Sequence, residues 1–345
     1  MSIASSVGGR GMILRERTEQ WEREKLSVYA ATAADSEGRP RQEPPCPART
    51  CFQRDIDRIV HAKSFRRLMH KTQVFLNPGG DHYRTRMIHT LEVSRIARTV
   101  ARAVALNEDL TEAIALGHDL GHTPFGHAGE WALAEMMPGG FTHYEQSLRV
   151  VDRLENSCSG LNLTYETRDG IAHHSGPIRA RTLEGQLVFI SDRVAYLTAD
   201  IDDALRAGVL QGGELPREVR ERLGERHSDR VNAFVLDLIA YNAKKDTISL
   251  SPSMDQIMSR LRVFLTERIY KNPEVKGEEA KARDILQKLF AHYLSHPNEL
   301  SPDILPVWEN EGAERAVCDY IAGMTDRYAV TRFEEIFIPK GWEKT

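Results

Sequence analysis

Residues 84–130 constrain the fold of this chain more than any other segment, because they combine helical periodicity with polar side chains on a face that should be apolar. Between residues 87 and 104 apolar residues recur at helical spacing, and His89 lies on the same stripe as Val93 and Ile96. The pattern predicts a helix whose inward face carries an imidazole near its start.

A second helix is expected to follow the first. The segment Asn107-Glu108-Asp109 marks its start, and Asp109 and Glu112 lie three residues apart, as in a capping box. Further along, Ile114 and His118 share one helical face, and Asp119 follows directly. The two helices would therefore each bring an inward histidine to the core, with a carboxylate beside the second.

Two histidines and one aspartate from packed helices form a plausible set of metal ligands. Neutral imidazole and carboxylate are common ligands of divalent transition metals. A single histidine of this kind is more often a hydrogen-bonded core or surface residue, but His89, His118 and Asp119 together favour a metal site. A fourth ligand has to come from elsewhere in the chain.

The helix predicted over residues 183–205 offers that fourth ligand. Asp192 and Tyr196 interrupt its otherwise apolar face, and Asp200 follows four residues after the tyrosine. Burying an unpaired carboxylate is costly, which favours Asp192 as a ligand.

The segment 120–127, "LGHTPFGH", is expected to begin a third helix, with Thr123 as N-cap and Pro124 at its first position. His127 and Glu130 would then lie three residues apart near the amide donors of a helix start, where anions bind well. A histidine paired with a carboxylate beside a phosphate suits proton transfer to a leaving group. The alternative is a histidine near a helix cap with a surface glutamate.

Basic residues surround the first predicted histidine. Between residues 52 and 102 there are eleven Lys or Arg against four Asp or Glu, which suits an anionic ligand or nucleic acid, although solvated helix faces also explain such runs. Arg86 lies three residues before His89, so it is a neighbour on the helix surface and could fork onto phosphate oxygens.

The complete pattern of His89, the pair His118-Asp119 and the later Asp192 resembles the HD-domain phosphohydrolases. The run "HDLGHTPFGHAGE" is similar to the bacterial dGTP triphosphohydrolase-like dNTPases within that superfamily, and matching segments extend from about residue 54 to residue 204. The resemblance implies an all-α fold, an HD-domain helical bundle with additional C-terminal helices.

The resemblance also implies a chemistry, namely attack of water at the α-phosphorus of a deoxynucleoside triphosphate with release of tripolyphosphate and a deoxynucleoside. His89, His118, Asp119 and Asp192 would hold the divalent metal ion, with Mn, Mg, Fe and Ni all compatible with these ligands. His127, oriented by Glu130, would protonate the departing oxygen.

The substrate contacts that the resemblance implies fall into two groups. On the sugar and base side these are Gln73, Tyr196 and Asp200. On the phosphate side they are Arg86, His122, His143 and Arg193. Without a substrate role, Gln73 would be an exposed glutamine on a strand, and His143 would be a surface histidine.

Two rival functions remain open from the sequence. One is another HD phosphohydrolase, acting on a nucleoside monophosphate, a cyclic dinucleotide or an alarmone. The other is a nucleotide-sensing or nucleic-acid-binding module. Besides the dNTP substrate, candidate partners are an allosteric dNTP effector, single-stranded nucleic acid and further copies of the chain in a homo-oligomer.

Composition is that of an ordinary globular protein, with 41% hydrophobic residues, 28% charged residues and a net charge of −4. No run of eighteen apolar residues is present, so we expect no membrane span. The four cysteines form no CxxC pair, and the N-terminus lacks the apolar core of a signal peptide, which together favour a reducing cytoplasm.

We expect three regions in this chain: an N-terminal helix and flexible arm over residues 1–51, the HD core over 52–210, and a C-terminal helical region packed on the core over 211–345. Within them we predict a helix over 54–68, a strand over 71–76, a helix from about residue 142, and C-terminal helices over 216–223, 229–242, 254–269, 278–294 and 313–328.

Overall fold

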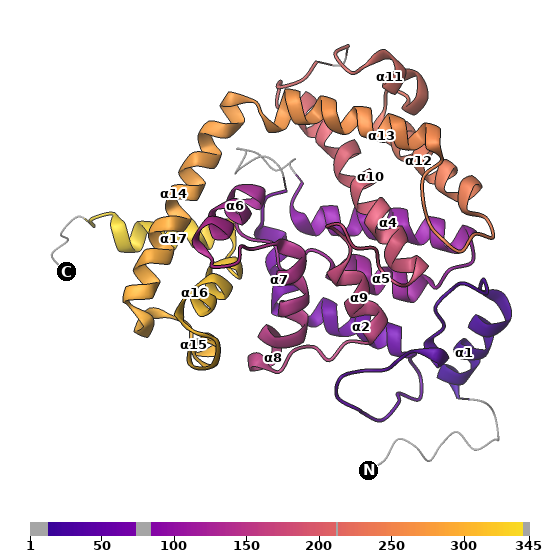
Figure 1. Cartoon of the computed structure of the whole chain (residues 1–345), viewed down its shortest axis with the longest axis horizontal. Helices are drawn as coiled ribbons and strands as arrows, with labels where there is room; N and C mark the ends of the chain where they lie inside the picture. Colours follow the sequence, from indigo (N-terminus) through magenta and orange to yellow (C-terminus); the bar gives the residue numbers. More distant parts are fainter. Residues whose placement is uncertain (1–12, 74–83, 212, 341–345) are drawn as a thin grey trace.

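Helices dominate the computed structural model, which describes residues 13–73, 84–211 and 213–340 (Figure 1). Within these ranges the only β contact is an isolated antiparallel bridge between Thr72 and Thr85. The all-α prediction is therefore confirmed. Of the strand predicted over residues 71–76, the first three residues form no strand and the rest lie outside the described residues.

The α-helices follow one another along the whole described chain. In order they are α1 (Leu14–Lys25), α2 (Cys51–His61), α3 (Lys63–Arg67), α4 (Arg86–Ala103), α5 (Glu108–Gly117), α6 (Gly126–Met136), α7 (His143–Arg149), α8 (Glu155–Cys158), α9 (Tyr165–Ala172), α10 (Leu183–Arg206), α11 (Arg217–Leu223), α12 (His227–Asn242), α13 (Pro252–Leu265), α14 (Pro273–Ser295), α15 (Leu305–Glu311), α16 (Ala313–Ala322) and α17 (Asp326–Phe337).

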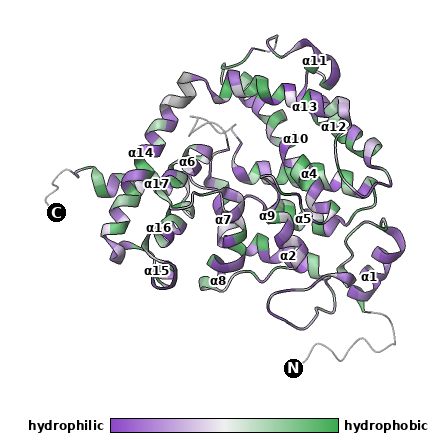
Figure 2. Ribbon diagram, viewed as in Figure 1, coloured by the Kyte–Doolittle hydropathy of each residue, from purple (hydrophilic) through white to green (hydrophobic). Residues whose placement is uncertain are grey.

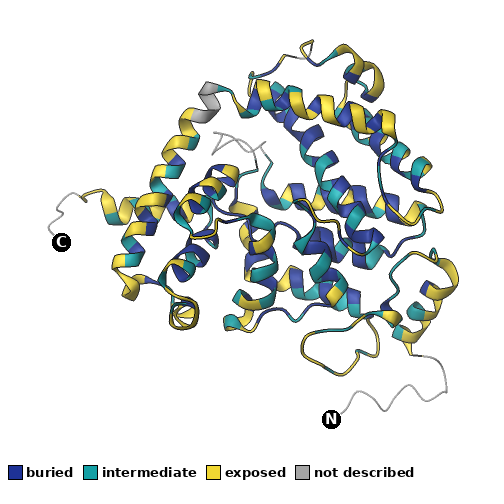
Figure 3. Ribbon diagram, in the orientation of Figure 1, coloured by how far each residue is buried: buried dark blue, intermediate teal, exposed yellow. Residues whose placement is uncertain are grey.

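The long helix α10 lies at the centre and packs against α4, α5, α9 and α12. Most of its side chains are buried (Figure 3). The helices are apolar on their packed sides and polar on their solvent sides (Figure 2). On α4, for example, Val93, Ala97 and Val100 are all fully buried. Burying a side chain of the size of valine contributes about 1.5–3 kcal/mol, so this stripe fixes the inward face of α4 and the position of His89 on it.

The helix predicted over residues 54–68 is in fact two helices. Ala62 between them is extended, with ψ 149°, which ends α2 and starts α3. The carboxylate of Glu155 accepts hydrogen bonds from the amides of Lys63 at 3.2 Å and Ser64 at 2.7 Å. This distant carboxylate satisfies the first amides of α3, which explains why a continuous helical pattern is interrupted there.

The second predicted helix begins within residues 107–109 as expected, but its N-cap is Asn107 and not Asp109. The side chain of Asn107 accepts a hydrogen bond from the amide of Leu110 at 3.1 Å. The predicted start of the third helix is wrong. Helix α6 begins at Gly126 and not at Pro124, because Phe125 adopts the left-handed conformation with φ 61°. The Phe125 amide donates to a carboxylate oxygen of Asp326 at 2.9 Å, a partner from the far end of the chain.

The structure has helices at all of the predicted C-terminal positions, but α15 was not predicted, α14 begins at Pro273 and not near residue 278, and two further helices differ in continuity. The helix expected over residues 313–328 is broken into α16 and α17, and Thr325 caps the second by accepting from the amide of Tyr328 at 3.2 Å. The helix expected over 254–269 ends at Leu265 and continues as a wider turn over Thr266–Tyr270. This turn lies beside the cavity described below.

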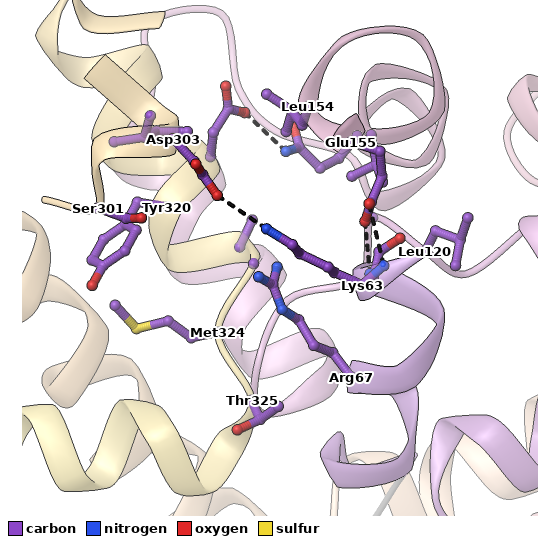
Figure 4. Close-up of a pocket in the computed structure, with 18 of the residues that line it drawn as sticks. Lys63, Arg67, Leu120, Leu154, Glu155, Ser301, Asp303, Tyr320, Met324 and Thr325 are labelled. Carbon is purple, nitrogen blue, oxygen red and sulfur yellow. Dashed lines mark hydrogen bonds and ion pairs between the residues drawn. The ribbon is translucent and has the colours of Figure 1, made fainter. Parts of the chain in front are cut away.

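Helices α14 and α16 pack with α6 in a second apolar cluster that includes Leu133, Leu286 and Val317. Near it, a cavity of about 450 Å³ separates α3 and α8 from the C-terminal segments (Figure 4). Lys63 crosses this junction to Asp303 at 3.1 Å. The C-terminal helices thus lie close to the loop between α5 and α6, which carries predicted site residues such as Asp119 and His122.

Lys71 is a buried residue that connects the loop between α5 and α6 to the end of α16. Its amine donates to the carbonyl oxygen of Ala322 at 2.8 Å and to the carbonyl oxygen of His122. Burial lowers the pKa of Lys71 to about 7, and a neutral amine still has the donors that both carbonyls need. This side chain joins the histidine-rich loop to the C-terminal region.

The N-terminal segment is held against the rest of the chain by polar contacts. Arg39 donates to the carboxylate of Asp55 and, at 2.6 Å, to the carbonyl oxygen of Asn162. Glu184 on α10 accepts from the amides of Ala31 and Asn107 at 3.1 and 2.9 Å. Among the described residues, no helix combines the length and apolar character needed to cross a membrane.

Candidate metal centre and active site

A cavity of about 500 Å³ collects nearly all residues that the sequence singled out. Of the predicted site residues, those that line it are Gln73, Arg86, His89, Asp119, His122, His127, His143, Asp192, Arg193, Tyr196 and Asp200. The two others, His118 and Glu130, contact lining residues from behind. Segments from α4, α7, α10 and the loop after α5 therefore converge on one space.

The four predicted ligands meet at one end of this cavity. The Nε2 atom of His89 lies 2.9 Å from Oδ1 of Asp192. The Nε2 atom of His118 lies 3.8 Å from Oδ1 of Asp119 and 3.8 Å from Oδ1 of Asp192. One donor atom from each of His89, His118 and Asp119 falls within 4.8 Å of the others. This spacing is compatible with one shared ion.

The hydrogen bonds of His118 support a ligand role. Its Nδ1 lies 2.7 Å from the carbonyl oxygen of Ala115, so Nδ1 carries the proton and Nε2 keeps its lone pair. Nε2 is buried and has no hydrogen-bond partner among the described residues. A buried acceptor without a donor fits a metal ligand better than a packing residue.

Both ligand carboxyls are held in the ionised form. Burial favours the neutral acid, but the Arg86 guanidinium and the neighbouring histidines hold the pKa of Asp119 well below its usual value. In the same way the hydrogen bond from His89 overcomes burial and lowers the pKa of Asp192 to about 2. Two buried carboxylates with two imidazoles are therefore a donor set that fits a divalent cation.

A second cluster lies on the other side of Asp119. Glu130 accepts from Nδ1 of His143 at 2.8 Å and from Nδ1 of His127 at 3.2 Å. These two hydrogen bonds outweigh burial and lower the pKa of Glu130 far below its usual value. The His122 ring stacks on that of His143 with 4.7 Å between centroids. His127, with 64% of its side chain exposed, is the member that reaches furthest into the cavity opening.

The predicted phosphate contacts differ in their surroundings. Arg86 is buried and donates from Nη1 to Oδ2 of Asp119 at 2.7 Å, so the carboxylate of Asp119 partly neutralises its positive charge. Arg193 stacks over the ring of Phe189 with 4.0 Å to the centroid, which leaves its guanidinium edge facing the cavity. Burial and the Arg86 charge hold the pKa of His122 well below its usual value, so His122 is neutral.

Three further lining residues, Tyr196, Asp200 and Tyr270, come from α10 and from the turn after α13. Tyr270 donates its hydroxyl hydrogen to Oδ2 of Asp200 at 2.5 Å, and burial raises the pKa of Asp200 to about 7. Burial and the Asp192 charge raise the pKa of Tyr196 to about 12, which keeps its hydroxyl protonated. Gln73 lines the same cavity, and its buried Oε1 has no partner within the described chain. These groups offer donors and acceptors to a neutral polar ligand.

Sequence reasoning missed several cavity residues. Arg262 lies in the last turn of α13, and Tyr270 and Lys271 end the wider turn that follows it. All three lie more than sixty residues beyond the predicted site, and no local pattern marks them. His174 lines the cavity as well. The pair His173-His174 is visible in the sequence, but nothing there shows that only the second member points inward.

Comparisons with known proteins find two matching domains and a similar fold. An HD domain matches residues 86–197, and a phosphohydrolase-associated domain matches residues 248–335. A phosphohydrolase from Bacteroides thetaiotaomicron shares the fold, with a TM-score of 0.50 at 19% identity over 81% of this chain and 67% of that chain. The range of the first match includes the four predicted ligands, and that of the second includes Arg262 and Lys271.

Relatives named deoxyguanosinetriphosphate triphosphohydrolase-like protein match along nearly the whole chain. The protein from Caldanaerobacter subterraneus is 52% identical, covering 96% of this chain and 98% of its own length. The one from Desulfatibacillum aliphaticivorans is 50% identical, covering 95% of this chain and 99% of its own. The chain therefore belongs to the deoxyguanosinetriphosphate triphosphohydrolase-like family of HD-domain phosphohydrolases.

Proposed function

We propose that this protein hydrolyses deoxynucleoside triphosphates at the α-phosphorus, releasing a deoxynucleoside and intact tripolyphosphate. The observation that carries the proposal is the position of the ligand cluster. It shares one cavity with the His127–Glu130–His143 cluster on one side and with Tyr196 and Asp200 on the other. The printed name of the relatives makes dGTP the first substrate to test.

Four residues would hold the divalent ion: His89, His118, Asp119 and Asp192. Bound there, an ion such as Mn, Mg, Fe or Ni supplies a Lewis acid for a phosphoryl oxygen and lowers the pKa of a water molecule. The residues of the chain supply the remaining functions, which are binding, orientation and proton delivery.

Basic residues at the cavity would neutralise the triphosphate. Arg193 lines it from α10, Arg262 from the last turn of α13 and Lys271 from the end of the following turn, and Arg86 contributes from α4. The sequence holds no glycine-rich lysine motif that grips β and γ phosphates for terminal transfer. A sugar held at Tyr196 and Asp200 would instead keep the α-phosphate nearest the ligand cluster.

The leaving group in this reaction is the 5′ oxygen of the deoxynucleoside. As water attacks, the bond from the α-phosphorus to O5′ breaks, and O5′ needs a proton. His127 would donate it, since Glu130 holds its Nδ1 at 3.2 Å and leaves the exposed ring facing the cavity. Glu130 is ionised and so stabilises a protonated imidazole.

A product assay tests the proposal directly. Each of the four dNTPs is incubated with enzyme loaded with Mn, Mg, Fe or Ni, and products are resolved by ion-exchange chromatography and phosphorus NMR. Tripolyphosphate with a deoxynucleoside supports α-attack. Orthophosphate with a dNDP, or pyrophosphate with a dNMP, contradicts it, and turnover confined to monophosphates or cyclic dinucleotides points to another HD phosphohydrolase reaction.

A further inference from the structure

His174 is a buried imidazole in the catalytic cavity to which the proposed reaction gives no role. Its exposed fraction is 1%, and it follows directly after α9. Its ring centroid lies 4.9 Å from that of His118 and 5.2 Å from that of His143. His174 therefore lies between the metal-ligand cluster and the cluster around Glu130.

The tautomer of His174 follows from its one hydrogen bond. Nδ1 lies 2.7 Å from the carbonyl oxygen of Ile171. Because a carbonyl oxygen only accepts, Nδ1 carries the hydrogen and Nε2 bears a lone pair. Nε2 is buried and has no partner in the part of the chain that the structure describes. An unmet buried acceptor costs about 1–3 kcal/mol, so Nε2 requires a donor that the described residues do not provide.

His118 makes the same backbone bond, from Nδ1 to a carbonyl oxygen three residues earlier at 2.7 Å. What differs is the environment of Nε2. Nε2 of His118 lies 3.8 Å from the carboxylate of Asp119 and 3.8 Å from that of Asp192. The ring nitrogens of His174, by contrast, have no carboxylate within 4.0 Å among the described residues. His174 thus lines the cavity beside the ligand cluster, and its buried Nε2 makes none of the contacts that hold the ligand carboxylates.

We propose that His174 is a positioning residue that accepts, through Nε2, a hydrogen bond from the water molecule that attacks phosphorus. The proposal rests on the hydrolysis proposed above. A water that donates one hydrogen to a fixed acceptor loses rotational freedom and presents its oxygen in a defined direction, which lowers the entropic part of the barrier. The backbone bond to Ile171 keeps the His174 ring in place and maintains the lone pair on Nε2.

Two substitutions test whether the acceptor at the Nε2 position matters independently of the imidazole ring. In His174→Asn, the amide nitrogen can keep the bond to Ile171, but no acceptor stands where Nε2 was. In His174→Gln, the amide oxygen reaches the Nε2 position and restores an acceptor. The matched control is His173→Asn, because His173 is only partly buried, pairs with Asp169 at 3.0 Å and does not line the cavity.

We expect His174→Asn to lower kcat by ~10²-fold with KM, metal content and melting temperature close to wild type, the scale of a misplaced reactant. His174→Gln should recover at least ~10-fold of that loss, and His173→Asn should behave as wild type. Unchanged kcat in His174→Asn at full metal occupancy, or no recovery in the glutamine variant, overturns the proposal.

A readout independent of substrate is the crystal structure of the Mn²⁺-loaded protein without nucleotide. We expect an ordered water within about 2.7–3.2 Å of His174 Nε2 in the wild type, and its loss in His174→Asn. Nε2 bound to the ion at ~2.0–2.3 Å would make His174 a ligand and overturn the proposal. If the water is present but no dNTP is hydrolysed, the proposed substrate fails while the assignment of Nε2 stands.

Discussion

Arg86 donates from Nη1 to Oδ2 of Asp119 at 2.7 Å, with both side chains buried. The arginine therefore orients a predicted metal ligand and keeps that ligand ionised. From the sequence, Arg86 was predicted only as a phosphate contact. The structure adds a second contact, because one guanidinium both reaches the carboxylate of Asp119 and lines the cavity. In the proposed reaction, Arg86 would therefore act on the ion and on the triphosphate together.

Arg86→Ala should weaken metal binding and dNTP binding together. We expect a metal affinity about 10–100-fold lower, the usual cost of removing a partner of a ligand, and a raised KM. Isothermal titration with Mn²⁺ and steady-state kinetics measure the two effects. Arg84→Ala is the control, since Arg84 pairs with Glu92 and Asp203 and does not line the cavity. Wild-type kinetics and metal affinity in Arg86→Ala would make Arg86 a structural residue only.

Asp119→Ala should abolish both bound metal and turnover. The substitution removes one of two ligand carboxylates and leaves Arg86 buried without its partner. Metal content is measured by mass spectrometry of the purified variant, and turnover by the product assay. Full activity of this variant after exhaustive chelation would remove the metal from the mechanism.

His127→Ala should keep metal and nucleotide but lower kcat by ~10²-fold or more, the usual scale for a positioned proton donor. The reason is that His127 lies in the cavity with Nδ1 bonded to Glu130, whereas the ligand cluster does not depend on it. His61→Ala, an exposed histidine on α2, is the control. An unchanged kcat at normal metal occupancy would reassign proton delivery to another group.

Glu184→Gln should change how stability depends on pH. Burial raises the pKa of Glu184 to about 7, against a usual value of 4.5, so the folded protein binds this proton more tightly than the unfolded chain does. The stability that this proton contributes is complete below pH 4.5 and is lost as the pH rises through about 7. Glutamine is neutral throughout and can still accept from Ala31 and Asn107.

The variant should therefore gain stability relative to wild type above pH 7, up to ~3 kcal/mol, with little difference at pH 4. Urea unfolding of both proteins across this range measures the difference. Glu24→Gln, an exposed position on α1, should show no such trend. Parallel pH profiles for wild type and Glu184→Gln would show that the pKa of Glu184 in the folded protein is not raised above that in the unfolded chain.

The fold class and most of the ligand set could be predicted from the sequence for a local reason. Helical periodicity places His89 on the same face as Val93, and the cost of burying a lone carboxylate singles out Asp192 on α10. Both arguments need only residues within a few turns of one another. The motif around His118 then predicted the family, which the relatives confirm.

Contacts between distant segments were decided only by the tertiary structure. The carboxylate of Asp326 accepts a hydrogen bond from the amide of Phe125, so α6 starts at Gly126 although the local sequence favours Pro124. The turn that brings Tyr270 into the cavity follows a helix whose periodicity alone predicts a continuous run. Of two adjacent histidines, His173 pairs with Asp169, whereas His174 lines the cavity. The packing of α9 on α5 and α10 determines which of the two points inward. Local propensity places each side chain on its own helix, whereas the packing of helices far apart in the sequence determines which side chains meet.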